Sequence, residues 1–228
     1  MSASFRSLTS VFSATDTHTC DKPAGLAVGD LMVFFLFFDS GSTYTVSTVP
    51  DGFALLGTKD TSAIYQEAFW KIATAGDVAA STFSVVYTDA GPGAAALVAF
   101  SDVDTEDPFV ASAMQSGYGS SPSLDPYLEA VTGDELLFAF WGSCGAVTFS
   151  NYATTVGDPA SWTEDLDVNT PTRGMGAAHG VATASGDLGA WKCSQSSANN
   201  CGVCALILKT GGVAPSPEPD LFLDGVWG

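Results

Sequence analysis

Four residues in the last third of the chain are of types that could hold a zinc ion: Cys193, Cys201, Cys204 and His179. A structural zinc site usually contains two closely spaced ligand pairs, whereas only Cys201 and Cys204 lie close together here. Free cysteines are also among the residues most often buried in protein cores. The spacing therefore favours reduced cysteines in a core over a zinc site, and we predict no cofactor.

A second group of candidate ligands is acidic. Between Asp102 and Pro108 the chain carries four carboxylates, at Asp102, Asp104, Glu106 and Asp107, and oxygen ligands at alternate positions are typical of calcium loops. The segment lacks the glycine and the distant glutamate of an EF-hand. We interpret it as a solvated turn after a strand, with calcium binding as the alternative.

Residues for catalysis are scarce. His18 and His179 are the only histidines, and the chain contains no G-x-S-x-G, H-E-x-x-H or P-loop motif and no glycine-rich dinucleotide-binding motif. A pair of carboxylates that cleaves glycosidic bonds stays open as an alternative, because two of the 25 acidic residues can reach the required spacing by chance. We predict that the protein is not an enzyme.

Aromatic side chains could instead stack on a sugar. The candidates are Tyr44, Tyr118, Tyr152, Trp162 and Trp191. Aromatic residues of a β-sandwich belong more often to its core. Core packing is therefore the preferred interpretation, and a sugar-binding surface is the alternative.

Charge and hydropathy exclude two classes of partner. Seven Lys plus Arg stand against 25 Asp plus Glu, which gives a formal net charge of -18, and such a surface repels nucleic-acid phosphates. The longest apolar run, Leu31 to Phe38, covers eight residues, far fewer than the ~20 of a membrane-spanning helix. No cationic and apolar secretion signal is visible at the N-terminus. We expect folding in a cytoplasm, without nucleic acid and without membrane insertion.

Strand patterns dominate the chain. Thr, Val, Phe and Tyr recur in short runs bounded by Gly, Pro, Asp and Ser, whereas no window has helical spacing with capping residues. The predicted strands are Leu31–Phe38, Ile64–Ile72, Ser81–Thr88, Ala95–Phe100, Glu135–Trp141, Gly176–Ala182 and Gly202–Lys209. The run at Leu31–Phe38 is apolar on both faces, so it needs cover on both sides. The fold class is therefore all-β, an antiparallel β-sandwich.

An internal repeat relates the two halves of the chain. Four blocks recur in order: Gly29–Phe35 with Gly133–Ala139, Pro50–Phe53 with Pro159–Trp162, Ile72–Asp77 with Val181–Asp187, and Ala95–Phe100 with Gly202–Ile207. We expect that neither half closes a two-layer core alone, so the halves contribute strands alternately to the two sheets of one sandwich. A tandem pair of small sandwiches is the alternative.

These patterns divide the chain into three parts. An N-terminal segment at 1–22 precedes a single sandwich at 23–210, with repeat halves at about 23–104 and 128–210. Residues 211–228 form a C-terminal arm, in which Pro215, Pro217 and Pro219 favour an extended polyproline geometry. The arm ends in candidate partner-binding residues, Leu221, Phe222, Leu223, Val226 and Trp227. We predict that they dock into a neighbouring subunit, with a tail folded onto its own domain as the alternative.

Several strings of turn and strand residues carry a family resemblance. They are Pro23–Leu31, Pro50–Phe53 with Leu55 and Leu56, Ala68–Ala73, and Ala99–Asp104 with Pro108. On these strings the chain resembles a recurring family of tailed-bacteriophage virion proteins with a jelly-roll-like β-sandwich. The resemblance covers roughly Pro23 to Lys209, although Phe53 stands where Trp is common and Asp102 where Gly is common.

The resemblance implies a non-enzymatic structural protein of the particle surface, either head decoration (cement) or part of a tail fibre or tip. Such a protein is made in the host cytoplasm, becomes part of the virion and assembles with other virion proteins, here as a homo-oligomer. No catalytic residue is implied. The alternative is a carbohydrate-binding, receptor-recognition module of a phage tail, with a host surface glycan as its partner.

Overall fold

The computed structural model describes residues 2–39, 44–61, 63–88, 91–124, 128–130, 132–156 and 158–211. The candidate partner-binding residues at 221–227 and nearly all of the Pro-rich arm lie outside the described residues. Within the described ranges the chain is built of β-strands and one short helix, and no helix there is long and apolar enough to cross a membrane.

Each half of the chain supplies its own set of elements. The first half, Ser4–Ser101, contains β1 (Ser4–Ser13), β2 (Thr17–Asp21), β3 (Leu31–Asp39), β4 (Val46–Thr48), β5 (Ala54–Asp60), β6 (Ile64–Ile72), α1 (Ala75–Ala79), β7 (Thr82–Tyr87) and β8 (Gly93–Ser101). The second half, Phe109–Leu208, contains β9 (Phe109–Gly119), β10 (Ser123–Leu124), β11 (Glu129–Ala130), β12 (Leu136–Ser143), β13 (Phe149–Thr154), β14 (Thr163–Thr170), β15 (Arg173–Val181), β16 (Gly186–Asp187), β17 (Trp191–Gln195) and β18 (Asn199–Leu208).

The two halves share one topology. The first forms a five-stranded sheet, β1-β8-β3-β6-β5, and a three-stranded sheet, β2-β7-β4. The second repeats this order as β9-β18-β12-β15-β14 and β10-β17-β13, with a small extra sheet, β11-β16. Successive strands pass between the two sheets of a half, as from β1 to β2 and from β3 to β4, which is the connectivity of a jelly roll. The all-β antiparallel sandwich and its internal repeat are confirmed.

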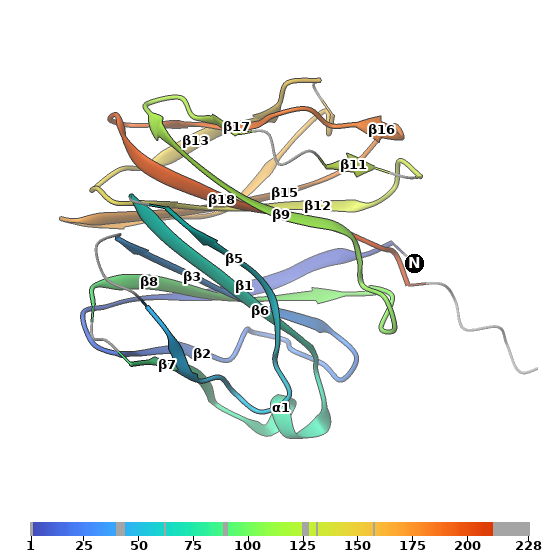
Figure 1. Cartoon of the computed structure of the whole chain (residues 1–228). Coiled ribbons are helices and arrows are strands. Elements are labelled where there is room, and N and C mark those ends of the chain that lie inside the picture. The colour runs from blue at the N-terminus through green and yellow to red at the C-terminus, as the bar shows by residue number, and fades with distance from the viewer. Residues whose placement is uncertain are drawn as a thin grey trace, which may run out of the picture.

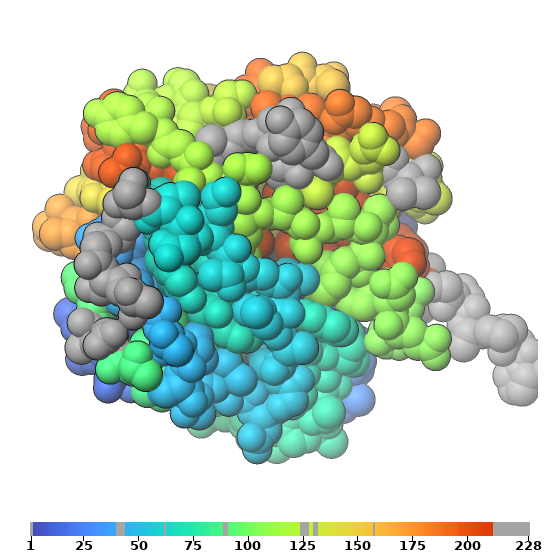
Figure 2. All heavy atoms as spheres, viewed as in Figure 1, coloured from blue at the N-terminus to red at the C-terminus, as the bar shows by residue number. Residues whose placement is uncertain are grey.

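The arrangement of the sheets differs from the expectation in two respects. Each half closes a two-layer core of its own, between its five-stranded and its three-stranded sheet. Strands do not alternate between two shared sheets, because the paired strands in every sheet come from the same half. The five-stranded sheets face each other and the three-stranded sheets lie outside them, so the block has four layers (Figure 1). The halves are in direct contact where β5 lies beside β9, as the space-filling view shows (Figure 2). Whether they unfold as one unit stays a prediction.

Three apolar cores hold the layers together, one inside each half and one between the five-stranded sheets. We call the last the central core. Phe35 of β3 lies in it with 1% of its surface exposed. Its ring stacks on Phe138 and Phe140 of β12 at 5.7 and 4.9 Å between centroids. The apolar run of β3 is thus buried on both faces, between the central core and the core of the first half, as its sequence requires.

The contacts between the halves obey an approximate twofold relation. Phe5 of β1 stacks on His179 of β15 at 5.0 Å, and Phe109 of β9 packs edge-on against Trp70 of β6 at 5.4 Å. Phe5 in the first half and Phe109 in the second occupy equivalent positions of the repeat, and so do Trp70 and His179.

The relation fails in one detail, at Phe37 of β3 and Gly142 of β12. A Cβ atom at Gly142 would overlap the Phe37 ring. These two residues also occupy matching positions in the repeat, because Leu31 and Leu136 do. A large side chain in one half therefore faces a glycine in the other.

The strand registers correct two of the four repeat blocks by one residue. Leu31 pairs with Ile72 and Leu136 with Val181, so Leu31 corresponds to Leu136 and not to Glu135. By the same argument Phe100 matches Leu208. The shared Gly-Asp dipeptide conceals the first of these registers. Glu135, and not Asp134, takes the place of Asp30, because the Ala73 amide donates to the Asp30 carbonyl oxygen and the Ala182 amide to that of Glu135.

Each repeat also begins earlier in the chain than the sequence indicates. The segment at 1–22 supplies β1 and β2, and β9 lies before residue 128. All three belong to the main sheets. Both β1 and β9 are edge strands of mostly partly exposed residues, with four Ser in β1 and with Ser, Gly and Ala in β9, so they lack the continuous apolar run that marks the central strands.

Candidate functional site

The cysteines lie in the cores. Cys193 and Cys201 belong to the core of the second half, whereas Cys204 points from the opposite face of β18 into the central core. Burial raises the pKa of the Cys201 thiol to about 12, so it is not poised for thiolate chemistry. The interpretation of these residues as reduced core cysteines is confirmed.

His179 lies apart from the cysteines, at the contact between the halves. Its Nδ1 atom is 2.8 Å from Oδ2 of Asp165, and its ring stacks on Phe5. In the ranges that the structure describes, no three His, Cys, Asp or Glu side chains gather as a metal site would require.

The acidic segment after β8 folds into a turn. The Asp104 carboxylate accepts hydrogen bonds from the backbone amides of Glu106 and Asp107, at 2.9 and 3.1 Å. These bonds hold the pKa of Asp104 below its usual range. Asp107 pairs with Lys209. The contacts are those of a turn that satisfies its own backbone.

The five candidate aromatic residues divide into three groups. Tyr44 and Trp191 are buried, at 7% and 1% exposed, as the core interpretation predicts. Tyr118 is 72% exposed on β9. Tyr152 and Trp162 are partly buried, and together they line an open groove of about 490 Å³ on the second half. We call it the aromatic groove; its walls include Asn151, Tyr152, Pro159, Ser161, Trp162 and Glu164.

Irregularities in two strands shape the aromatic groove. The pairing of β13 with β17 shifts between Ser150 and Ala153, so Asn151 and Tyr152 lie in a bulge, and Asn151 has a φ of 53°. The pairing of β14 with β15 shifts just after Glu164. Bulges redirect side chains and are common beside functional sites.

Packing holds the aromatic walls in place. The Trp162 ring meets Trp191 of the core at 5.4 Å in a T-shaped arrangement. The Tyr152 hydroxyl lies over Gly176 of β15, where any Cβ atom would overlap it. The two rings therefore have fixed positions before any ligand arrives.

The aromatic groove is electronegative. Glu164 is exposed on its wall, and its pKa is raised by burial of the carboxyl and then by the charges of Asp167 and Asp165. The Asp167 carboxylate accepts a hydrogen bond from the Phe149 amide at 2.9 Å. The described residues that line the groove include no basic side chain.

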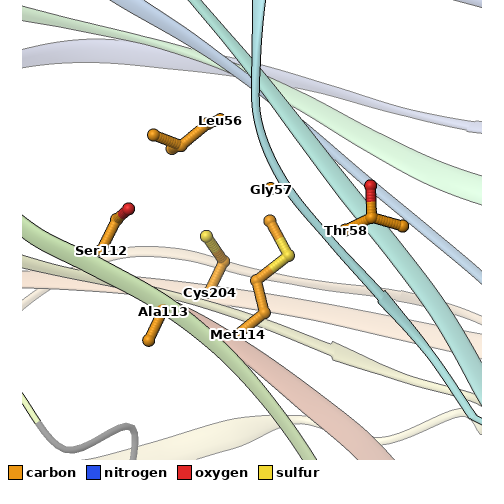
Figure 3. A pocket seen from close by; sticks show the side chains of 7 residues that line it. All are labelled: Leu56, Gly57, Thr58, Ser112, Ala113, Met114 and Cys204. Carbon is orange, nitrogen blue, oxygen red and sulfur yellow. The ribbon is translucent and has the colours of Figure 1, made fainter.

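A second cavity lies at the contact between β5 and β9 (Figure 3). Leu56 and Thr58 lie on one side of it, with Met114 and Cys204 on the other. Its volume is about 100 Å³, whereas pockets for small molecules usually measure about 300–1,000 Å³. We interpret it as a packing gap between the halves.

The sequence reasoning assigned no place to His18, which is fully buried in the first half. Its ring meets the edges of Phe38 and Tyr87, at 5.0 and 6.2 Å, and Nε2 lies close to Gly93. Neither ring nitrogen has a well-formed hydrogen bond among the described residues. Burial lowers the pKa of His18 from 6.5 to about 4.

Replacing His18 with Leu should flatten the acid dependence of stability. Between pH 6.5 and pH 4, His18 is protonated in the unfolded chain and stays neutral in the folded protein. The stability of the wild type therefore falls as the pH falls through this window. The loss from this residue is about 3 kcal/mol at 1.4 kcal/mol per pKa unit. Urea unfolding at pH 7 and pH 4 measures it. Equal pH dependence in the two proteins would contradict the assignment.

Comparison of the chain with family models, with curated proteins and with solved structures gives no match.

Proposed function

We propose that the protein is a non-enzymatic structural component of a tailed-bacteriophage particle, as head decoration or as part of a tail fibre or tip. The observation that carries the proposal is the duplicated jelly roll, whose halves are joined through a central core into one four-layered block. Such a block offers a large, rigid surface for assembly with other virion proteins. The family resemblance points to the same role.

The base of the C-terminal arm supports this role. Thr210 forms a β-bridge with Val103, and the amide of Gly211 donates to the Asp102 carbonyl oxygen at 2.7 Å. Gly211, at the start of the arm, is therefore fixed to the block. An apolar peptide that begins at a fixed point is suited to docking into a neighbouring subunit.

Localisation in intact particles tests the proposal. An antibody raised against the purified chain and labelled with gold should bind particles at symmetric positions on the head or the tail. The host lysate without particles serves as the control. If the chain is absent from purified particles and present only in the cytoplasm of infected cells, the structural role is wrong.

Replacing both Phe222 and Trp227 with Ala should sharply reduce assembly and leave the fold intact. Polyproline geometry spans about 3 Å per residue, and buried aromatic anchors commonly dominate an interface. We expect an unchanged melting temperature and a sharp loss of self-assembly or of incorporation into particles, measured by light scattering and by particle composition. A lower melting temperature with normal assembly would instead show a tail that clasps its own block.

The aromatic groove favours a second function, recognition of a host surface glycan. Sugar rings stack on aromatic faces, and polar groups beside the face fix their orientation. Tyr152, Trp162 and Glu164 supply both elements on one open surface. A virion protein could combine this role with the structural one.

A further inference from the structure

We infer that the aromatic groove of the second half takes an uncharged saccharide, stacked on its aromatic wall and hydrogen-bonded to Glu164. The inference rests on the second proposed function, glycan recognition, and names its ligand class and residues.

The internal repeat shows which of these residues the fold itself requires. Strand pairing matches Trp162 with Phe53 and Glu164 with Leu55, since Ala54 pairs with Trp70 and Thr163 with His179. The first half thus builds the same sheets with apolar residues at both positions. The aromatic ring at the first position packs on the core in both halves, whereas the fold of the first half needs no carboxylate at the second. Glu164 is therefore free to serve recognition, beside a ring that the core already holds in place.

The backbone around these positions also differs between the halves. Strand β13 has six residues, whereas its counterpart β4 has three. Both strands carry a bulge, between Val46 and Thr48 in β4 and between Ser150 and Ala153 in β13, and in β13 the bulge forms one wall of the aromatic groove. The two halves therefore differ here in strand length and in side chains.

The shape and polarity of the aromatic groove select a sugar among small ligands. Its volume of about 490 Å³ lies within the range of small-molecule pockets. Trp162 offers a ring held by Trp191, and a rigid aromatic face loses little entropy on binding. Glu164 is exposed and has no hydrogen bond or ion pair with the described residues, so its carboxylate is free to accept ligand hydroxyl groups.

Charge decides the class of sugar. Glu164, Asp165 and Asp167 lie along one short stretch of β14. The pKa of Glu164 is raised by burial of its carboxyl and then by the negative charges of the two aspartates. A uronate, sialate or phosphate group would meet the same repulsion without a basic partner. An uncharged saccharide supplies hydroxyl donors without that cost.

Binding of the full chain to immobilised oligosaccharides tests the inference. The panel contains uncharged hexose and N-acetylhexosamine oligomers, acidic oligomers with uronic or sialic acid, and basic oligomers with free amino sugars. The variants Trp162→Phe and Glu164→Leu introduce the residues of the first half, which its fold tolerates. The matched controls are Leu55→Glu, the reverse change in the first half, and Tyr118→Ala, an exposed aromatic outside the groove.

We expect retention by uncharged oligomers and none by acidic ones. The retention should be weakened by roughly tenfold in Glu164→Leu, which loses a charge-assisted hydrogen bond. A smaller loss is expected in Trp162→Phe, with wild-type binding in both controls. Binding confined to acidic or basic oligomers would overturn the ligand class and leave glycan recognition standing. Wild-type binding by both groove variants would place the sugar elsewhere. No binding to any oligomer would remove glycan recognition itself, without touching the structural role.

Discussion

The variant Phe35→Asp is expected to yield no folded protein. Phe35 is 1% exposed between the stacked rings of Phe138 and Phe140. Loss of a buried Phe ring costs about 3–5 kcal/mol, and an unpaired carboxylate in the same place costs more. Together they approach the whole stability of a typical domain, about 5–15 kcal/mol. Soluble yield and far-ultraviolet circular dichroism measure the outcome.

An exposed site in the first half provides the control for this variant. Leu55 is 56% exposed on β5, so Leu55→Asp should melt within a few degrees of wild type. A milder core change, Phe35→Leu, should fold with a lowered melting temperature. If Phe35→Asp melts like wild type, the central core does not hold the halves together as described.

Expression of either half alone, Met1–Asp104 or Thr105–Gly228, is expected to give an insoluble or molten product. Each half has a core of its own, yet the face that meets the other half is apolar as well. Separation would expose that face to water, and large exposed apolar patches drive aggregation. Co-expression of the two halves should restore a soluble complex, which affinity purification through a tag on one half would recover.

Polar contacts across the same face strengthen this expectation. The Gln66 side chain donates to the Gln115 carbonyl oxygen at 3.0 Å, and Arg173, 3% exposed, pairs with Asp39. A separated half would leave these groups without their partners. Two halves that are each soluble and melt cooperatively would show instead that they are independent tandem domains.

The sequence predicted the central strands well and the layers poorly. All seven predicted strands coincide with observed strands, because β-branched and aromatic runs between turn residues identify buried strands. A run that is apolar on both faces, such as Leu31–Phe38, requires two covering layers and does not say from which half they come. Whether the halves form one shared sandwich or two fused ones depends on which distant strands pair with each other. The local sequence of a strand does not encode its partner.

Only some residues of the candidate site could be identified from the sequence. Tyr152 and Trp162 were candidates from their residue type, although the same reasoning also proposed the buried Trp191. Glu164 could not be selected among 25 acidic residues, because a bulge that turns a side chain into a groove has no periodic signature. A comparison of the two repeats residue by residue would have found Leu55 replaced by Glu164, once the register was known.

The unequal pair Phe37 and Gly142 makes the two halves non-interchangeable. Two copies of the first half, paired in the same way, would bring one Phe37 against another where there is room for a single ring. Two copies of the second half would leave a hole between glycines. If the halves of two chains were exchanged, only a first half paired with a second half would fill this space. The unequal pair thus disfavours pairing between like halves.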